Sequence, residues 1–206
     1  MIDGPKSLVA RGYDLIAEAY LERYADSAVR DYWLRKLIAL LTENARILDL
    51  GCGAGIPVAR ELAASGFEVI GVDGSARQIE LARNNVLGAA FLQADMTSVE
   101  FSPTSFDAIS AFYSITHVPR DEHAALFRQI STWLKPGGVF VASLGADKPG
   151  DWKGDWLGVE MFFSHFCAET NEQLIRNAGL AIEEARVVEQ DNEDGRFLWI
   201  VARVVT

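Results

Sequence analysis

The hydrophobic positions of the chain follow two different periods. Between residues 7 and 41, apolar residues recur at steps of three and four, which is the spacing of one helical face. After residue 45, short apolar runs alternate with helical spacing, and runs of this length are typical of buried strands. The pattern predicts two helices and then strands that alternate with helices. The predicted strands span 46–50, 67–72, 89–93, 106–112 and 138–144, and the predicted helices lie near 54–65, 75–87 and 120–134.

The last third of the chain has a different order. A helical segment over 171–178 ends at Gly179, and two strand-like runs at 181–189 and 196–204 follow it. The polar residues 190–195 between them predict a turn, so these two strands should be antiparallel to each other. The alternation in the rest of the chain predicts right-handed crossovers and a parallel sheet covered on both faces. The sequence therefore indicates an α/β fold.

The first predicted strand runs directly into a turn that is rich in glycine. Its sequence over residues 46–55 is Arg-Ile-Leu-Asp-Leu-Gly-Cys-Gly-Ala-Gly. Glycines at alternate positions let the backbone turn and approach a ligand closely, which is typical of a nucleotide-cofactor loop. In the dinucleotide fingerprint the third glycine falls three residues after the second, but Ile56 stands there and Gly55 comes one residue early. This spacing weakens the dinucleotide interpretation, and a purely structural turn is a further alternative.

The order Asp-x-Gly-x-Gly-x-Gly after a strand resembles motif I of the class I S-adenosylmethionine (SAM)-dependent methyltransferases. In that family the loop wraps the methionine part of the cofactor, which implies contacts at Asp49, Gly51, Cys52 and Gly53. The family's fold is a Rossmann-like three-layer sandwich with a seven-stranded, mostly parallel sheet whose last strand is antiparallel. The predicted hairpin at the end of the chain agrees with that topology. So does the run Leu-Lys-Pro-Gly-Gly at 134–138, which is common in small-molecule members.

An acidic residue ends the second predicted strand. Asp73 lies 22 positions beyond Gly51 and precedes Gly74, where a carboxylate can accept both hydroxyl hydrogens of an adenosine ribose. The alternative is a helix N-cap, since a helix is predicted to begin near Ala76, but Ser75 is better placed for that role. NAD enzymes also bind ribose in this way, so Asp73 does not distinguish the two cofactors.

A second acidic residue, Asp95, ends the third predicted strand and is followed by Met96. In the methyltransferase family an Asp at this place accepts the adenine amino hydrogen, and the next residue packs on the ring. An ordinary surface Asp is the alternative. The resemblance adds Phe112, at the end of the fourth strand, and Tyr20 to the implied cofactor contacts. Tyr20 and Tyr13 can also be core-facing helix residues.

Open α/β sheets bind ligands beyond the carboxyl ends of their strands. We therefore expect the methyl acceptor to lie between a helical cap at 1–45, the segment after Phe112 and an insertion at 146–168. The insertion combines glycines with many aromatic residues, a composition that favours a mobile substrate lid over regular structure packed on the core. Packing on the core is the alternative.

Two histidines are candidates for a general base. His117 follows the fourth strand and His165 lies in the insertion, and either could take a proton from a hydroxyl acceptor. An orienting hydrogen bond is the alternative for His117, and His123, on a predicted helix, is a weaker candidate. The chain lacks the Asn/Asp-Pro-Pro-Tyr/Phe motif of many nucleic-acid and protein N-methyltransferases, and it has no Pro-Cys pair. A small-molecule acceptor is therefore favoured.

Composition sets the remaining expectations. With 206 residues, 50% of them hydrophobic, the chain should form a single domain over 1–206. A net charge of −10 disfavours nucleic acid, and the two cysteines indicate neither a disulfide framework nor a metal site. No apolar stretch has the length of a membrane span or a signal peptide, so we expect a cytoplasmic protein. Both a monomer and a homodimer are compatible with the sequence. An NAD-dependent oxidoreductase and a non-catalytic SAM-binding regulator are the alternative functions.

Overall fold

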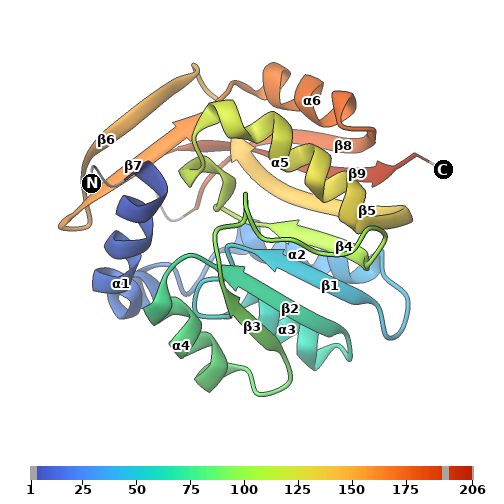
Figure 1. Ribbon diagram of the computed structural model, residues 1–206, viewed down its shortest axis with the longest axis horizontal. Helices are drawn as coiled ribbons and strands as arrows, with labels where there is room; N and C mark the ends of the chain where they lie inside the picture. Colours follow the sequence, from blue (N-terminus) through green and yellow to red (C-terminus); the bar gives the residue numbers. More distant parts are fainter. Residues whose placement is uncertain (1–3, 192–194, 206) are drawn as a thin grey trace.

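A seven-stranded sheet forms the centre of the protein in the computed structural model, which describes residues 4–191 and 195–205 (Figure 1). Across the described residues, the strand order is β3-β2-β1-β4-β5-β9-β8. Strand β9 is antiparallel to both of its neighbours, β5 and β8, and the pairs among β3, β2, β1, β4 and β5 are parallel. The strands are β1 (Arg46–Leu50), β2 (Glu68–Asp73), β3 (Ala90–Gln93), β4 (Phe106–Ala111), β5 (Leu134–Gly145), β8 (Leu180–Glu189) and β9 (Arg196–Val204). The predicted fold class is confirmed.

Helices cover both faces of this sheet. One face carries α2 (Ala28–Ala39), α3 (Val58–Ala64) and α4 (Ala76–Asn85), and the other carries α5 (Arg120–Trp133) and α6 (Ala168–Asn177). Each face has its own buried cluster, because every central strand presents apolar side chains to both sides. Trp33 of α2 stacks on Trp199 of β9 with ring centroids 5.5 Å apart, while Phe127 of α5 meets Phe140 of β5 on the opposite face.

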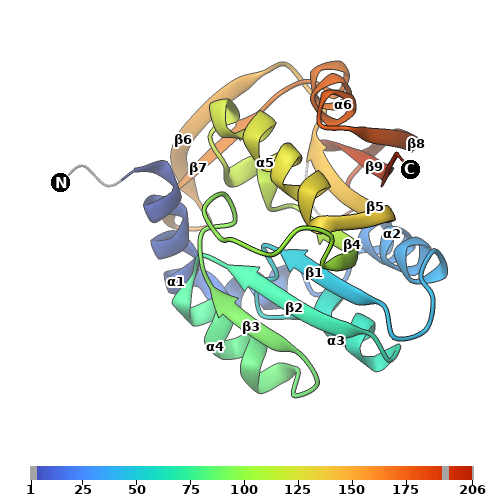
Figure 2. The same cartoon turned by 45° about the vertical axis from the view of Figure 1, so that its right-hand side comes forward.

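Two further elements lie beyond the carboxyl ends of β1 and β2. They are the helix α1 (Pro5–Arg23) and the hairpin of β6 (Gly150–Trp156) and β7 (Val159–His165), and α1 runs beside β7 in both views (Figures 1 and 2). The hairpin is a separate two-stranded antiparallel sheet. Of the helices within residues 4–191 and 195–205, none combines the length and apolarity that a membrane crossing requires.

The insertion at 146–168 differs from the expectation of irregular structure. It forms a regular hairpin, because its tryptophans pack on other aromatic rings and do not need a place in the core of the main sheet. Trp156 stacks on Tyr24, which follows directly after α1, with ring centroids 6.1 Å apart, and Trp152 stays 46% exposed beside Phe163. The mobility of this hairpin remains a prediction.

The helix expected from residue 54 begins only at Val58. Gly51, Gly53 and Gly55 all have φ between 52° and 75°, and alternate left-handed residues cannot continue an α-helix. Gly55 brings the loop against the core, since a Cβ there would lie 3.1 Å from Val86. The glycine turn is therefore longer than the pattern indicated.

Candidate active site

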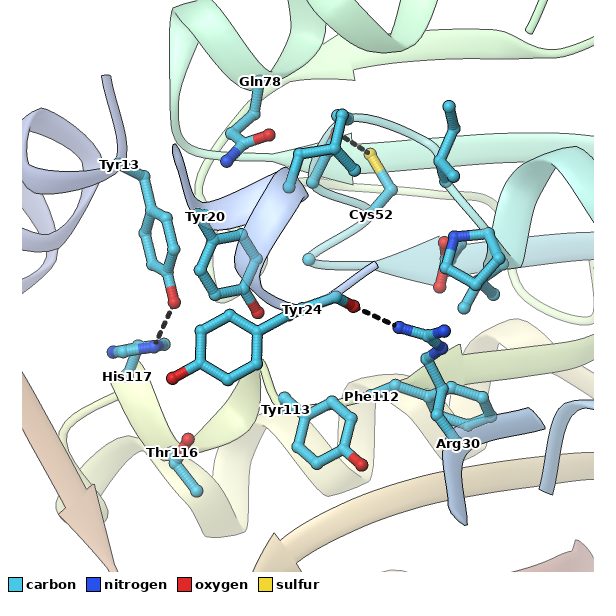
Figure 3. Close-up of a pocket in the computed structure, with 18 of the residues that line it drawn as sticks. Tyr13, Tyr20, Tyr24, Arg30, Cys52, Gln78, Phe112, Tyr113, Thr116 and His117 are labelled. Carbon is cyan, nitrogen blue, oxygen red and sulfur yellow. Dashed lines mark hydrogen bonds between the residues drawn. The ribbon is translucent and has the colours of Figure 1, made fainter. Parts of the chain in front are cut away.

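Two adjoining cavities open where the carboxyl ends of β1, β2 and β4 meet α1. The larger cavity has a volume of about 600 Å³ and the smaller about 110 Å³. The larger extends along the ends of β2 and β3, whereas the smaller lies between the glycine turn and the aromatic residues of α1 and the hairpin (Figure 3). The residues that line both cavities are Tyr13, Tyr20, Gly51, Gly53, Gln78, Phe112, Tyr113 and His117.

The glycine turn presents bare backbone to these cavities. At Gly53 a Cβ would point into open space, with Oε1 of Gln78 the nearest atom at 3.8 Å. At Gly51 a Cβ would instead lie 2.2 Å from Cβ of Ser114, so this glycine is required by the packing of the protein itself. The Gly53 amide donates a hydrogen bond of 2.9 Å to Oδ2 of Asp73. A cofactor can therefore lie directly on the backbone at Gly53.

Asp49 and Arg30 give the smaller cavity one buried anion and one buried cation. Oδ1 of Asp49 accepts a hydrogen bond of 2.7 Å from Ser110, but its Oδ2 has no partner among the described residues. Burial raises the pKa of Asp49 to about 7, against the lowering effect of Ser110. Arg30 is 7% exposed, and its guanidinium donates to the carbonyls of Tyr24 and Ala25 and forms an ion pair with Asp31, with Nη2 3.2 Å from Oδ1. The open Oδ2 of Asp49 could accept from the ammonium of an amino acid, whereas a carboxylate would have to share Arg30 with Asp31 and the two carbonyls.

Asp73 joins the glycine turn to the start of α4. Its Oδ2 accepts from Gly53 N, and its Oδ1 accepts from the amide of Ser75 at 2.9 Å. The N-cap of α4 is Ser75, whose Oγ accepts from Gln78 N, so the alternative role for Asp73 as the cap is wrong. Burial raises the pKa of Asp73, against the lowering effect of the backbone amides. Asp73 and Gly74 line the larger cavity, where ribose binding stays a prediction.

Asp95 and Met96 line the same cavity, but Asp95 already has partners. Lys6, in the first turn of α1, places Nζ 2.8 Å from Oδ2 of Asp95 and 2.6 Å from Oε2 of Glu122. The amide and the hydroxyl of Thr97 both donate to Oδ1. Burial alone would raise the pKa of Asp95, yet Lys6 and Thr97 together hold it below its usual value. An adenine amino group would have to share this carboxylate with α1.

His117 connects α1 to the hairpin. Its Nδ1 lies 2.8 Å from the carbonyl oxygen of Phe162, which can only accept, so Nδ1 carries the proton. Nε2 is therefore the acceptor for the hydroxyl of Tyr13, at 2.9 Å (Figure 3). Burial lowers the pKa of His117 to about 4. The imidazole is neutral at physiological pH, with its basic nitrogen turned toward a residue that lines both cavities.

A family model described as a methyltransferase domain matches residues 20–185. The chain belongs to this methyltransferase family. The match confirms the predicted class, a SAM-dependent methyltransferase with SAM as its cofactor, in preference to a dinucleotide-dependent oxidoreductase. The glycine turn and the acidic strand ends line the two cavities, and this is the part of the fold where the sequence predicted cofactor binding.

Individual relatives agree with the family. The sterol 24-C-methyltransferase of Candida albicans is 33% identical over 106 residues, which are 48% of this chain and 28% of that protein. The 27-O-demethylrifamycin SV methyltransferase of Amycolatopsis mediterranei is 28% identical over 152 residues, which are 63% of this chain and 55% of that protein. The methyltransferase chain therefore spans about half or less of the length of these curated relatives.

Solved structures share the fold. The magnesium protoporphyrin IX methyltransferase of Synechocystis PCC 6803, determined with bound SAM, matches with a TM-score of 0.77 and 15% identity over 98% of each chain. Such low identity shows the fold and nothing finer.

The predicted cofactor residues of the methyltransferase gather around the two cavities. Asp73, Gly74, Asp95 and Met96 line the larger one, Asp49 and Cys52 line the smaller one, and Gly51, Gly53, Tyr20 and Phe112 line both. The thiol of Cys52 is buried behind the loop, 3.6 Å from the carbonyl of Gly53, and burial raises its pKa. Any contact of Cys52 with the cofactor would therefore be made by its backbone.

Of the histidines considered, the structure brings only His117 to the cavities. His165 ends β7 and packs against Gly145, where a Cβ would lie 2.3 Å from that of His165, and it lines neither cavity. The antiparallel pairing of the hairpin carries position 165 toward the main sheet, away from the glycine turn. His123 is buried on α5 and bonds to the carbonyl of Val118.

The sequence analysis did not predict several residues of the site. Arg30, Gln78 and Thr116 are buried and line the smaller cavity, and both amide atoms of Gln78 lack a partner among the described residues. Only the position of Gln78, three residues after the cap Ser75, offered a signal, since it turns that side chain toward the glycine loop. Within the same ranges, no group of His, Cys, Asp and Glu side chains has the arrangement of a metal site.

Proposed function

We propose that this protein transfers the methyl group of SAM to a hydroxyl group of a small, largely apolar molecule. The observation that carries the proposal is the hydrogen bond between Tyr13 and His117 at the junction of the two cavities. A hydroxyl must lose its proton when it is methylated. The pair offers a basic nitrogen, through a phenol, at the place where cofactor and acceptor would meet.

The residues that would hold SAM divide into two groups. Asp73, Gly74, Asp95 and Met96 are suited to the adenosine, because they combine carboxylate acceptors with a flat, polarizable side chain along the larger cavity. Asp49 is suited to the ammonium group and Arg30 to the carboxylate at the other end. The two cavities adjoin at the glycine turn, which agrees with one ligand extending through both.

When bound, SAM would supply an activated methyl carbon and one positive charge, and the thioether left after transfer would be neutral. Tyr13 orients the acceptor hydroxyl and takes up its proton while giving its own proton to Nε2 of His117. Nδ1 keeps its hydrogen bond to the carbonyl of Phe162, so the ring does not turn. His117 could hold the additional proton because the transfer would remove the positive charge of the cofactor from the same site. The net charge of the buried site is then unchanged.

The acceptor class is supported by the walls of the smaller cavity. Tyr20, Tyr24, Trp156 and Phe163 form a continuous aromatic surface, with ring centroids 4.9 to 5.9 Å apart along the series Tyr24, Tyr20, Trp156 and Phe163. Such a surface favours flat apolar molecules and helps to exclude water during transfer. The net charge of −10 disfavours a nucleic-acid acceptor. The names of the sterol and rifamycin methyltransferases likewise refer to small acceptors.

Radiolabelled methyl transfer tests the proposal. The protein is incubated with SAM carrying a labelled methyl group and with pools of hydroxylated, amine and thiol small molecules. We expect label in a hydroxylated product that is formed in proportion to S-adenosylhomocysteine. Tight SAM binding by calorimetry with no transfer to any pool would favour the alternative of a non-catalytic SAM-binding regulator. Transfer to amines alone would contradict the role of the Tyr13–His117 pair.

A further inference from the structure

Thr116 has a buried hydroxyl without a partner in the wall of the smaller cavity. The residue is 5% exposed, and its Oγ1 forms no hydrogen bond with any described residue. A hydroxyl removed from water without replacement of its hydrogen bonds is unfavourable, so such groups in folded proteins usually meet a ligand or an ordered water. Thr116 lines only the smaller cavity and does not border the larger one.

The position of Thr116 is fixed by its surroundings. It lies in the short 3-10 helix Ile115–His117, which is closed by a hydrogen bond of 3.0 Å from His117 N to the carbonyl of Ser114. Oγ of Ser114 in turn donates to the carbonyl of Leu50 at the end of β1, at 2.7 Å. The hydroxyl therefore belongs to a rigid part of the site, as recognition of a substituent requires.

Thr116 is also on the acceptor side of the cavity. Figure 3 shows Thr116 and His117 close together, with Tyr13 above His117, while Arg30 lies at the opposite side. Asp49 and Arg30 are suited to the methionine end of the cofactor, and His117 is already bonded to Tyr13 and Phe162. Thr116 is thus available for a different polar group, near the proton-accepting pair.

The size of the cavity limits what can enter. An engineered apolar cavity of about 150 Å³ in another protein holds one benzene molecule, and the smaller cavity here has about 110 Å³. Its aromatic walls favour a flat ring. Because its volume is below that of the benzene-holding cavity, and because Asp49 and Arg30 of the methionine end also line it, it admits only the edge of one flat ring with its substituents. A threonine hydroxyl can donate and accept, so it can bind a hydroxyl or a carbonyl substituent on that ring.

We propose that Thr116 is a specificity-determining residue that selects acceptors carrying two polar substituents on one flat ring. One substituent is the hydroxyl that reacts beside Tyr13, and the other exchanges a hydrogen bond with Oγ1 of Thr116. This inference rests on the proposed function and adds the substrate class to it. An acceptor without the second substituent would leave Thr116 unpartnered, which disfavours its binding.

The test compares phenol with benzene-1,2-diol, benzene-1,3-diol and benzene-1,4-diol. Binding of each to the S-adenosylhomocysteine complex is measured by calorimetry, and transfer is measured with labelled SAM, for the wild type, Thr116→Val and Thr116→Ser. Val keeps the branched shape without the hydroxyl, and Ser keeps the hydroxyl. We expect at least one diol to bind the wild type and the Ser variant about tenfold more tightly than phenol, and the Val variant to bind both alike. The ratio of kcat/KM for that diol over phenol should fall by the same factor in Thr116→Val.

Three outcomes would overturn the inference. The diols could show no advantage over phenol, which is expected if a water already satisfies Thr116. Thr116→Val could weaken phenol and diol equally, as a purely structural residue would. None of the four probes could bind, although SAM binds and other acceptors are methylated. In each case the proposed function survives, because it fails only when SAM binds and no hydroxylated acceptor of any kind is methylated.

Discussion

Oη of Tyr13 lies 2.9 Å from Nε2 of His117, although the two residues are 104 positions apart in the chain. This contact connects α1 with the segment after β4, and the second ring nitrogen of His117 continues it to the β6–β7 hairpin. Three elements that surround the acceptor side of the site are therefore held by one imidazole. The proposed proton transfer and the contact of α1 with the hairpin therefore depend on the same ring.

His117→Gln should lower kcat by about 10² to 10⁴ with SAM affinity nearly unchanged, because the variant loses the proton acceptor and keeps a group that can bond to Phe162. Tyr13→Phe should act in the same direction. His165→Ala is the matched control, since His165 lines neither cavity, and its kcat should equal that of the wild type. Steady-state rates and calorimetric titration with SAM separate the two effects. If both His117→Gln and Tyr13→Phe turn over normally between pH 6 and 9, catalysis rests on positioning alone.

The pH dependence of stability should reveal the buried imidazole. The folded pKa of His117, about 4, lies below its ordinary value of 6.5, so the unfolded chain binds the proton first as the pH falls. The stability that neutral His117 contributes is complete above pH 6.5 and is lost toward pH 4, by at most about 1.4 kcal/mol per pH unit. The free energy of unfolding of the wild type and of His117→Gln, measured with denaturant at pH 6.5 and at pH 4, isolates the contribution of His117 to stability. A constant difference between the two proteins would contradict the buried, neutral state.

Asp49→Asn should stabilise the protein and impair its cofactor binding. The folded pKa of Asp49, about 7, lies above its ordinary value of 3.8, so its contribution is complete below pH 3.8 and is lost as the pH rises through 7. Removal of the charge should therefore raise the melting temperature at pH 8. SAM should bind about tenfold or more weakly, because the ammonium loses a charged acceptor. Ser110→Ala, which removes only the partner of Oδ1, is the control for local packing. Unchanged SAM affinity in Asp49→Asn would remove Asp49 from the cofactor site.

Two glycines of the same turn should respond differently to substitution. Gly53→Ala places a Cβ in open cavity at φ 52°, so the protein should fold with a loss of roughly 1–2 kcal/mol and bind SAM poorly. Gly51→Ala should destabilise the fold more, because its Cβ would overlap Ser114. Thermal unfolding with and without SAM measures both. Normal SAM affinity in folded Gly53→Ala would show that the cofactor does not lie on this part of the loop.

Asp73→Ala should weaken SAM binding by about 1.5–3 kcal/mol, the range for charged hydrogen bonds. Asp95→Ala should weaken it less, since Asp95 already accepts from Lys6 and Thr97. SAM or S-adenosylhomocysteine should raise the melting temperature of the wild type, whereas NAD should not. Calorimetry measures the SAM affinity of both variants. If Asp95→Ala weakened SAM binding more than Asp73→Ala, the carboxylate at the adenine would contribute more than the one at the ribose.

The residues that the sequence predicted for the cofactor all line the two cavities, whereas of the predicted bases only His117 does, and this difference has a physical reason. Asp49, Gly51, Asp73 and Asp95 stand at strand ends, and parallel pairing brings all carboxyl strand ends to one edge of the sheet. Local order in the chain therefore determines their place. Arg30 and Thr116 acquire their positions only when α1, α2 and the hairpin pack together, which no local pattern encodes.

The β6–β7 hairpin is a second case in which a local sequence pattern does not determine which residues reach the site. Its many aromatic residues and glycines indicated a substrate lid, but the antiparallel register that removes His165 from the site depends on the turn at Leu157 and Gly158, both with positive φ. A shift of the register by one residue would have moved every side chain of the hairpin to its other face. Composition alone does not determine which of two faces meets the cavity.

The bond from His117 to the hairpin ends on a main-chain oxygen, that of Phe162, and every amino acid supplies such an oxygen. Mutation can therefore replace the side chains of β6 and β7 over evolutionary time without disturbing the tautomer of the imidazole. Related enzymes could diverge in the molecules they accept and still inherit an intact proton-handling apparatus. Under the proposed function, the side chains of β7 would contact the acceptor, while a main-chain atom of the same strand would hold the catalytic imidazole in place.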